Sequence, residues 1–330
     1  MIRFGIVGFG LHGDRRLMPG FAQSKQCEVT ALQRRNLQKA QSSAAQYKIP
    51  LAFDSVAGLC ASPEVDAVLI TSPDALHLPD TLTALAQGKP VLCEKPMAMN
   101  AAEVRQMIAA ADCAKLLLGV AHIFRFENST RWFRDQIASG VIGRPVYARS
   151  EFCYSAQNHG RAWLTDPTLA AGGPIADVGV HCIDTLRFIL QDEVIRVTAR
   201  AVSDALSGPV EAAAALTLEF ARGTLGTVLV STRADYRTPL EVVGEKGVLH
   251  ADNGLTVDNP IELRLRQCDK ISATTVSNAE AYGVQVDAFA DALEGRVQFP
   301  APATEGLINQ EILDAAFRSL KTGRAENVSL

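Results

Sequence analysis

The sequence has no run of basic residues and no long uninterrupted apolar segment, and each absence excludes a class of protein. Its 32 lysines and arginines are mixed with 36 aspartates and glutamates, which gives a formal net charge of −4. Neither nucleic acid nor a membrane surface is therefore expected as a partner. A membrane span would need about 18 consecutive apolar residues, and no window approaches that length.

The sequence also has no cysteine pair with the spacing of a metal site. The seven cysteines are scattered and none forms a CxxC pair, so neither a bound metal nor a disulfide framework is expected. Several lie inside apolar runs, which is usual for free cysteines in a reducing compartment. The opening MIRFGIVGFG leads straight into a glycine turn and lacks a signal-peptide layout, so we expect a cytoplasmic protein.

What the first part of the chain does contain is an alternation of apolar runs and helical patterns. The apolar runs are residues 3–10, 28–33, 65–71, 89–93 and 115–122, and the helical patterns are residues 13–24, 37–48, 75–88 and 100–114. Strands that are apolar on both faces and separated by helices predict a parallel sheet covered on each side. With right-handed crossovers this becomes a doubly wound α/β fold.

After residue 122 the pattern changes. Helices are expected at residues 125–140, 175–190, 280–293 and 304–320, and strands at 144–155, 194–202, 211–221, 223–234, 238–252 and 260–268. Successive strands without crossover helices predict an antiparallel or mixed sheet. A length of 330 residues suggests about two domains, and we place them at 1–122 and 123–330.

The glycine motif GFGLHG closes the first strand and opens a helix, which is the context that dinucleotide binding requires. The first glycine permits a tight turn, the second lets the backbone approach a pyrophosphate, and the third permits close packing of helix and strand. The helix N-terminus favours the phosphate charge. The expected cofactor contacts here are Gly8, Phe9, Gly10, Leu11, His12 and Gly13.

The end of the second strand indicates which dinucleotide binds. NAD-binding proteins usually carry an acidic residue there for the ribose 2′-hydroxyl, but this chain has Gln33, Arg34 and Arg35. Two guanidiniums can bind a 2′-phosphate, so NADP is preferred over NAD. The alternative is a pair of solvated arginines on an exposed loop.

Two further strand ends carry polar residues. Because the carboxyl ends of parallel strands line the ligand crevice, small polar groups there can contact the cofactor. The segment ITSPDALH supplies Thr71, Ser72, Pro73 and His77, and His77 either contributes to this site or caps and packs its helix. The next strand runs directly into Glu94, Lys95 and Pro96. Pro96 restricts Lys95 to extended backbone geometry, which helps to aim its side chain.

The order of the glycine motif, TSPDALH, EKP and the later DVGVHCID resembles the family of glucose–fructose oxidoreductase, inositol dehydrogenase and MocA. The resemblance covers nearly the whole chain. It implies a Rossmann domain followed by an α/β domain on a large open sheet, which often makes contacts between subunits of a homodimer or homotetramer. It also implies hydride transfer between NAD(P) and a carbinol or carbonyl, commonly of a sugar or polyol.

The resemblance assigns the catalytic roles to Lys95, Asp177 and His181. Lys95 can donate to the reacting oxygen and stabilise negative charge that develops as a carbonyl is reduced. Asp177 and His181 are four residues apart, which places them on one face of a helix, and His181 can exchange the hydroxyl proton near neutral pH. Glu94 either orients Lys95 or contacts the nicotinamide ribose. Glu94, Lys95 and Trp163 are expected to contact the cofactor.

For other residues near the expected substrate, the sequence leaves more than one role open. His122 and Arg125 lie at the domain junction, where they either bind substrate or pack. Asp184 is one helical turn beyond His181 and is either substrate-facing or structural. Relatives commonly have an arginine after the tryptophan, where this chain has Leu164, with Arg161 two residues before Trp163. Pro174 follows the glycine pair of the same loop.

Two alternatives to a sugar or polyol oxidoreductase follow from the same motifs. One is a glycoside hydrolase that retains NAD for transient oxidation, which Arg34 and Arg35 disfavour. The other is a non-catalytic regulator that binds a dinucleotide, which the presence of Lys95, Asp177 and His181 disfavours.

Overall fold

The computed structural model describes residues 1–156 and 160–329, which form two compact units. The first unit comprises Met1–Ile123 and Tyr282–Leu307, and the second comprises Phe124–Ala281 and Ile308–Leu330. The division after Ile123 lies one residue from the expected boundary. The return of Tyr282–Leu307 to the first unit was not expected, because an amphipathic pattern shows that a helix has an apolar face but not which core that face meets.

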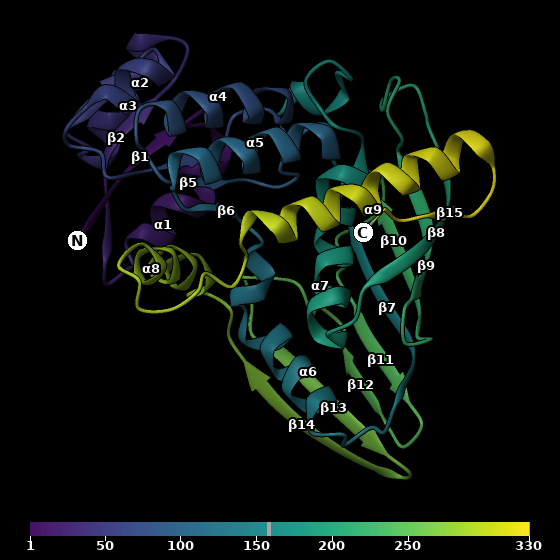
Figure 1. Ribbon diagram of the computed structural model, residues 1–330. Coiled ribbons are helices and arrows are strands. Elements are labelled where there is room, and N and C mark those ends of the chain that lie inside the picture. The colour runs from purple at the N-terminus through teal and green to yellow at the C-terminus, as the bar shows by residue number, and fades with distance from the viewer. Residues whose placement is uncertain (157–159, 330) are drawn as a thin grey trace. The chain divides into compact units, whose positions relative to one another are not determined.

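The first unit is built on a six-stranded parallel sheet in the order β3-β2-β1-β4-β5-β6 (Figure 1). Its strands are β1 (Ile2–Val7), β2 (Cys27–Gln33), β3 (Leu51–Phe53), β4 (Ala67–Ile70), β5 (Val91–Cys93) and β6 (Leu118–Val120). The central strands are buried on both faces, as their continuous apolar runs predict. The strand order reverses between β1 and β4, and in open α/β sheets a ligand crevice lies at that point, outside the carboxyl ends of the strands.

The helices of the first unit connect these strands. They are a π-helical turn at Gly13–Leu17 that continues into α1 (Met18–Phe21), then α2 (Leu37–Tyr47), α3 (Val56–Ala61), α4 (Asp74–Ala86) and α5 (Ala101–Ala114), with α8 (Ala281–Leu293) returning later. Helices α4 and α5 pack side by side (Figure 1). Phe289 of α8 packs on Phe4 of β1, with ring centroids 5.9 Å apart, which explains why α8 belongs to this core.

The second unit is built on a nine-stranded sheet in the order β14-β13-β12-β11-β7-β10-β9-β8-β15 (Figure 1). Its strands are β7 (Pro145–Cys153), β8 (Val194–Val202), β9 (Ala213–Phe220), β10 (Leu225–Ser231), β11 (Leu240–Gly244), β12 (Val248–Ala251), β13 (Ile261–Gln267), β14 (Lys270–Val276) and β15 (Glu326–Asn327). Among the described strands of this sheet, β7 and β10 pair in parallel and the other neighbours pair antiparallel. The expected α/β class, with one parallel and one mostly antiparallel sheet, is confirmed.

Helices of the second unit are α6 (Asn128–Ala138), α7 (Val180–Leu190) and the greater part of α9 (Ala303–Thr322). Helix α7 packs on β7 and β10, so the inward-facing residues of those strands are buried. Outward-facing Leu225, Leu229 and Val202 remain exposed on the opposite face of the sheet. Among the described residues this face is therefore not covered by a helix, and it carries these apolar side chains together with polar ones such as Thr217, Glu219 and Thr227.

Several elements differ from the sequence expectation. The run at residues 238–252 forms two strands, β11 and β12, and the chain turns back between them at Lys246 and Gly247, turn residues that indicate a break or a bend. The short β3, α3 and β15 and the exposed β14 were not predicted. Strand β14 is exposed along nearly its whole length, so it shows no alternation of buried and exposed residues. Within the described residues, no helix combines the length and apolar character needed to cross a membrane.

Candidate active site

The glycine turn at the end of β1 has the geometry that the motif predicts. Gly8 has φ of +74°, and a Cβ there would lie 2.5 Å from the backbone nitrogen of Ser72. A Cβ at Gly13 would lie 2.8 Å from the ring of Phe9. At Gly10 a Cβ would meet only the Gly8 carbonyl oxygen, at 3.7 Å, so a ligand has room to approach the backbone. These positions fit the turn, packing and approach roles of a dinucleotide-binding loop.

The end of β2 presents two arginines and no acid. Gln33 is buried, accepts a hydrogen bond from the Gly8 N–H at 3.1 Å and donates to the Asp54 carbonyl at 3.0 Å. Gln33 thus braces the glycine turn. Arg34 donates to the Ser43 hydroxyl of α2 at 2.8 Å and is half-buried, whereas Arg35 is exposed. The end of β2 is therefore positively charged.

The end of β4 is held by bonds within the first unit. The Thr71 hydroxyl donates to the Val7 and Gly8 carbonyls at 2.9 and 3.1 Å. The Ser72 hydroxyl donates to Asp80 at 2.7 Å, and burial raises the pKa of that carboxyl. Pro73 is the residue that precedes α4. His77 is buried with both ring nitrogens facing carbonyl oxygens, which favours the alternative that it packs its helix.

The end of β5 carries Glu94, Lys95 and Pro96. One Glu94 oxygen lies 2.9 Å from His12 Nε2 in the glycine turn, and the other accepts from the Lys95 N–H at 3.3 Å. Glu94 therefore links the glycine turn to the segment that carries Lys95. Lys95 is half-buried, and the peptide bond between it and Pro96 is cis.

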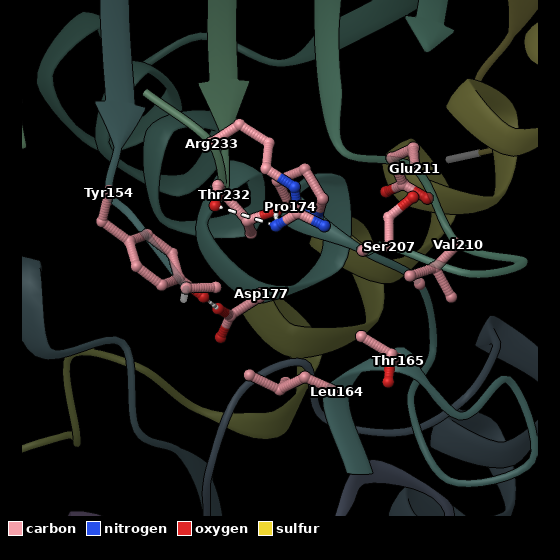
Figure 2. A pocket seen from close by; sticks show the side chains of 13 residues that line it. Tyr154, Leu164, Thr165, Pro174, Asp177, Ser207, Val210, Glu211, Thr232 and Arg233 are labelled. Carbon is pink, nitrogen blue, oxygen red and sulfur yellow. Dashed lines mark hydrogen bonds between the residues drawn. The ribbon is translucent and has the colours of Figure 1, made fainter. Parts of the chain in front are cut away.

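In the second unit, Asp177 and His181 lie at the start of α7 and are 8% and 9% exposed. The residues from Ile175 to Gly179 form a π-helical turn, a feature often found at functional sites, where a regular helix was expected. The Tyr154 hydroxyl donates to Asp177 (Figure 2), and Arg161 Nη1 lies 3.8 Å from the other Asp177 oxygen. The ring of His181 packs against those of Phe124 and Phe152, at centroid distances of 4.5 and 6.1 Å.

Asp177 also borders a hollow in the second unit (Figure 2), whose empty space of about 320 Å³ includes open solvent. Tyr154, Leu164, Glu211 and Arg233 line it with the Gly172–Pro174 segment. Burial and the neighbouring Asp177 raise the pKa of Tyr154, so its hydroxyl stays protonated and continues to donate. The hollow is thus bordered by a carboxylate, a phenol and a guanidinium, groups that can hydrogen-bond hydroxyl-rich molecules.

Comparison with known proteins identifies the family. Residues 2–122 match the model of the oxidoreductase family with an NAD-binding Rossmann fold, and residues 130–250 match the GFO/IDH/MocA C-terminal domain. A 1,5-anhydro-D-fructose reductase from Ensifer adhaerens is 31% identical, with 99% of each chain covered. The chain belongs to the GFO/IDH/MocA family. It is an NAD(P)-dependent oxidoreductase that acts on CH–OH groups.

Other GFO/IDH/MocA relatives agree with this assignment. The trans-1,2-dihydrobenzene-1,2-diol dehydrogenase of Mus musculus is 32% identical over 75% of this chain and 73% of its own. The structure of aldose-aldose oxidoreductase from Caulobacter crescentus complexed with glycerol has a TM-score of 0.92 at 23% identity, with 99% of each chain covered. Levoglucosan dehydrogenase in complex with NADH and levoglucosan gives 0.89 at 19% identity, with full coverage of both chains. The structural matches establish the shared fold.

The described residues of this GFO/IDH/MocA protein fit the dinucleotide that the family model implies. Gly10 leaves room for a pyrophosphate to approach the backbone, Gly8 and Gly13 permit the turn and its packing, and Arg34 and Arg35 add positive charge at the end of β2. In the same part of the chain, no cluster of three or more His, Cys, Asp or Glu is arranged to hold a metal ion.

Arg125 and Asp184 form a buried ion pair. Arg125 Nε lies 3.1 and 3.0 Å from the two Asp184 oxygens, and its Nη2 lies 2.6 Å from Oδ1. Asn309 of α9 donates to the same carboxylate at 2.8 Å. Since the two charged residues are 6% and 1% exposed, this geometry favours the packing alternative for both. His122 is also buried, at 1% exposure.

Sequence reasoning missed several groups at this site. Tyr154 contacts Asp177, and Glu211 and Arg233 line the hollow, whereas Arg161, which the sequence placed in this loop, also lies near Asp177. Tyr154 follows directly after β7, so its place at the end of a predicted strand was the signal in the sequence that could have indicated it. Arg161 faces Asp177, whereas Leu164 lines the hollow and Trp163 is half-buried on a 3₁₀ turn. Residues 157–159 of the same loop lie outside the described part of the chain.

Proposed function

We propose that this protein is an NADP-dependent oxidoreductase of sugars or polyols. The observation that carries the proposal is the charge at the end of β2, where Arg34 and Arg35 stand in place of an acid and Gln33 is used to brace the glycine turn. A 2′-phosphate is stabilised by such guanidiniums, whereas a 2′-hydroxyl lacks its usual acidic acceptor.

The substrate class is supported by the groups around Asp177 and by the relatives. Tyr154, Arg161 and Arg233 can hydrogen-bond hydroxyl groups. The names of the relatives include a 1,5-anhydro-D-fructose reductase and a D-xylose 1-dehydrogenase that uses NADP⁺. A polyhydroxylated carbonyl or carbinol is therefore the proposed substrate.

Each proposed catalytic residue has one task. The dinucleotide, when bound, supplies or accepts the hydride. Lys95 donates a hydrogen bond to the reacting oxygen and stabilises its negative charge. His181 gives a proton to that oxygen during reduction and takes it during oxidation. Asp177, oriented by the Tyr154 hydroxyl, binds a substrate hydroxyl or orients His181.

A titration with NADPH and NADH tests the cofactor assignment. We expect tighter binding of NADPH, and we expect Arg34→Ala to weaken NADPH by about tenfold while changing NADH little. The readout is nicotinamide fluorescence, and Lys270→Ala on exposed β14 is the matched control for loss of one positive charge. Equal weakening of both dinucleotides in Arg34→Ala would contradict the 2′-phosphate assignment. A screen of sugars and polyols with NADP⁺ or NADPH then tests turnover.

We also propose that the uncovered face of the second sheet pairs two or four copies of the chain. Leu225, Leu229 and Val202 are 51%, 41% and 66% exposed on this face, and exposed large apolar side chains favour burial against another surface. Light scattering on a sizing column should give a dimer or tetramer, and Leu229→Lys should shift it toward monomer. A monomeric wild-type protein would refute this part.

A further inference from the structure

His77 is a buried histidine whose two ring nitrogens both face backbone carbonyl oxygens. It lies in the first turn of α4 and is 1% exposed. Its Nδ1 is 2.9 Å from the Pro96 oxygen, and its Nε2 is 2.8 Å from the Ser72 oxygen. These two carbonyls belong to the loops that follow β5 and β4, which are neighbouring strands of the parallel sheet.

This arrangement favours a charged ring. A carbonyl oxygen only accepts hydrogen bonds, so each nitrogen must carry a hydrogen, and a histidine with two N–H groups is an imidazolium. A neutral ring would leave one nitrogen and one carbonyl oxygen, both electron-rich, facing each other at hydrogen-bond distance. Such a buried mismatch is costly compared with a satisfied pair.

The surroundings support the charge. Asp74 and Asp80 lie on the same helix, three residues to either side, and Cys93 faces the ring from β5. Burial acts to lower the pKa of His77, but Cys93, Asp74 and the Pro96 carbonyl outweigh it and raise that pKa to about 10. This direction agrees with the charge that the two carbonyl contacts favour.

The two bonded loops carry the chemistry of the first unit. Pro96 directly follows Lys95. The bond from His77 to the Pro96 carbonyl therefore fixes the backbone from which the Lys95 side chain extends. The Ser72 backbone lies against Gly8, where a Cβ would come within 2.5 Å of the Ser72 nitrogen. One buried ring thus connects the lysine-bearing loop with the loop that supports the glycine turn.

We propose that His77 is a positioning residue, a permanently charged cross-link that aims Lys95 by holding the Pro96 carbonyl against the Ser72 loop. This deepens the proposed function and rests on it for the role of Lys95. His77 contacts neither substrate nor cofactor, because its ring is enclosed and both nitrogens are used within the protein. Its contribution is to keep the Lys95 ammonium where a displacement of about 1 Å is enough to slow the reaction strongly.

The charge state is tested first, by ¹⁵N NMR of the histidine rings. With six histidines in the chain, the signals can be assigned by replacing them one at a time. At pH 8, where an ordinary histidine is neutral, we expect both nitrogens of His77 to give imidazolium shifts with slowly exchanging N–H protons. A neutral tautomer at pH 8 would overturn the cross-link. This result does not depend on any substrate, so it separates the inference from the proposed function.

The positioning role is tested by coupling to Lys95. His77→Gln removes the charge and can reach only one of the two carbonyls with its amide nitrogen, so we expect kcat to fall about tenfold with little change in NADPH affinity. In a Lys95→Ala background the same substitution should change kcat less than about twofold, since no lysine remains to be aimed. An equal loss in both backgrounds would show a general structural role and refute the proposal.

The control for packing is Thr81→Val. Thr81 is buried on the same helix, and its hydroxyl has no partner among the described residues, so this variant perturbs α4 without touching either loop. We expect an unchanged kcat. Should His77→Gln fail to fold, His77→Asn takes its place in the coupling test, and the NMR result on the wild-type protein still decides the charge.

Discussion

The carboxyl edge of the parallel sheet and the start of α7 hold their polar side chains in different ways. At the sheet edge, Gln33 and His77 bond to backbone atoms of neighbouring loops. At the start of α7, Asp177 is held by the side chains of Tyr154 and Arg161. A backbone hydrogen-bond partner remains when the residue that carries it is substituted. A side-chain partner is lost when its own residue is substituted. Gln33 and His77 should therefore respond to changes in those residues alone, whereas Asp177 should respond to changes in its partners as well.

The largest expected effect is at the sheet edge itself. Lys95→Ala removes the only group assigned to stabilise charge on the reacting oxygen, so turnover should fall at least about a hundredfold. NADPH affinity should be nearly unchanged. Steady-state kinetics and fluorescence titration measure the two quantities, with exposed Lys270→Ala as control. Wild-type rates in Lys95→Ala would remove this lysine from the mechanism.

A similar loss is expected at α7. His181→Ala removes the proposed proton donor and acceptor, and kcat should fall by about a hundredfold with NADPH binding preserved. The matched control is His250→Ala in β12. The His250 ring lies 3.0 Å from an Asp252 carboxylate oxygen and is not part of α7. If both histidine variants keep full activity, proton exchange must be assigned to another group.

A smaller effect should come from the partner of Asp177. Tyr154→Phe keeps the ring and removes the hydroxyl that donates to the carboxylate, and the loss of one hydrogen bond to a charged group should lower kcat/KM by about tenfold. Tyr147→Phe on β7, the strand that ends just before Tyr154, removes a hydroxyl that pairs with Thr227 at 2.8 Å and should leave activity unchanged. Equal effects of the two substitutions would mean that Asp177 does not depend on Tyr154.

The smallest effect concerns stability. Glu127 is fully buried in the second unit, one of its carboxyl oxygens has no partner among the described residues, and burial raises its pKa well above 4.5. The folded state therefore holds this proton to higher pH than the unfolded state. Stability should fall as pH rises from the unfolded pKa toward the raised folded value.

Glu127→Gln removes that proton and its pH dependence. We expect near-equal stability of the two proteins at pH 4 and an advantage of about 1–2 kcal/mol for the variant at pH 8, measured by urea unfolding. Turnover should be unchanged. A wild-type protein as stable at pH 8 as the variant would show that Glu127 ionises without cost.

Much of the architecture was predictable because it depends on local patterns. Apolar runs at regular spacing indicated the parallel sheet, and the glycine motif indicated the turn, where Gly8 does have a positive φ. The EKP and DVGVHCID segments indicated the candidate site. The partners of these residues were not predictable, since Arg125 and Asp184 are 59 positions apart and His12 and Glu94 are 82 apart. No periodicity connects residues at such separations.

By itself, the sequence determined the fold class, the dinucleotide turn and the family, because these depend on residue types at short, regular spacing. Only the tertiary structure decided that Arg125 belongs to an ion pair, that Tyr154 serves Asp177, and that His77 joins two loops. The physical reason is that a buried polar group must find a partner wherever the fold brings one. Which partner it finds depends on which strand ends and helix faces the fold brings together. Separation along the chain does not indicate this.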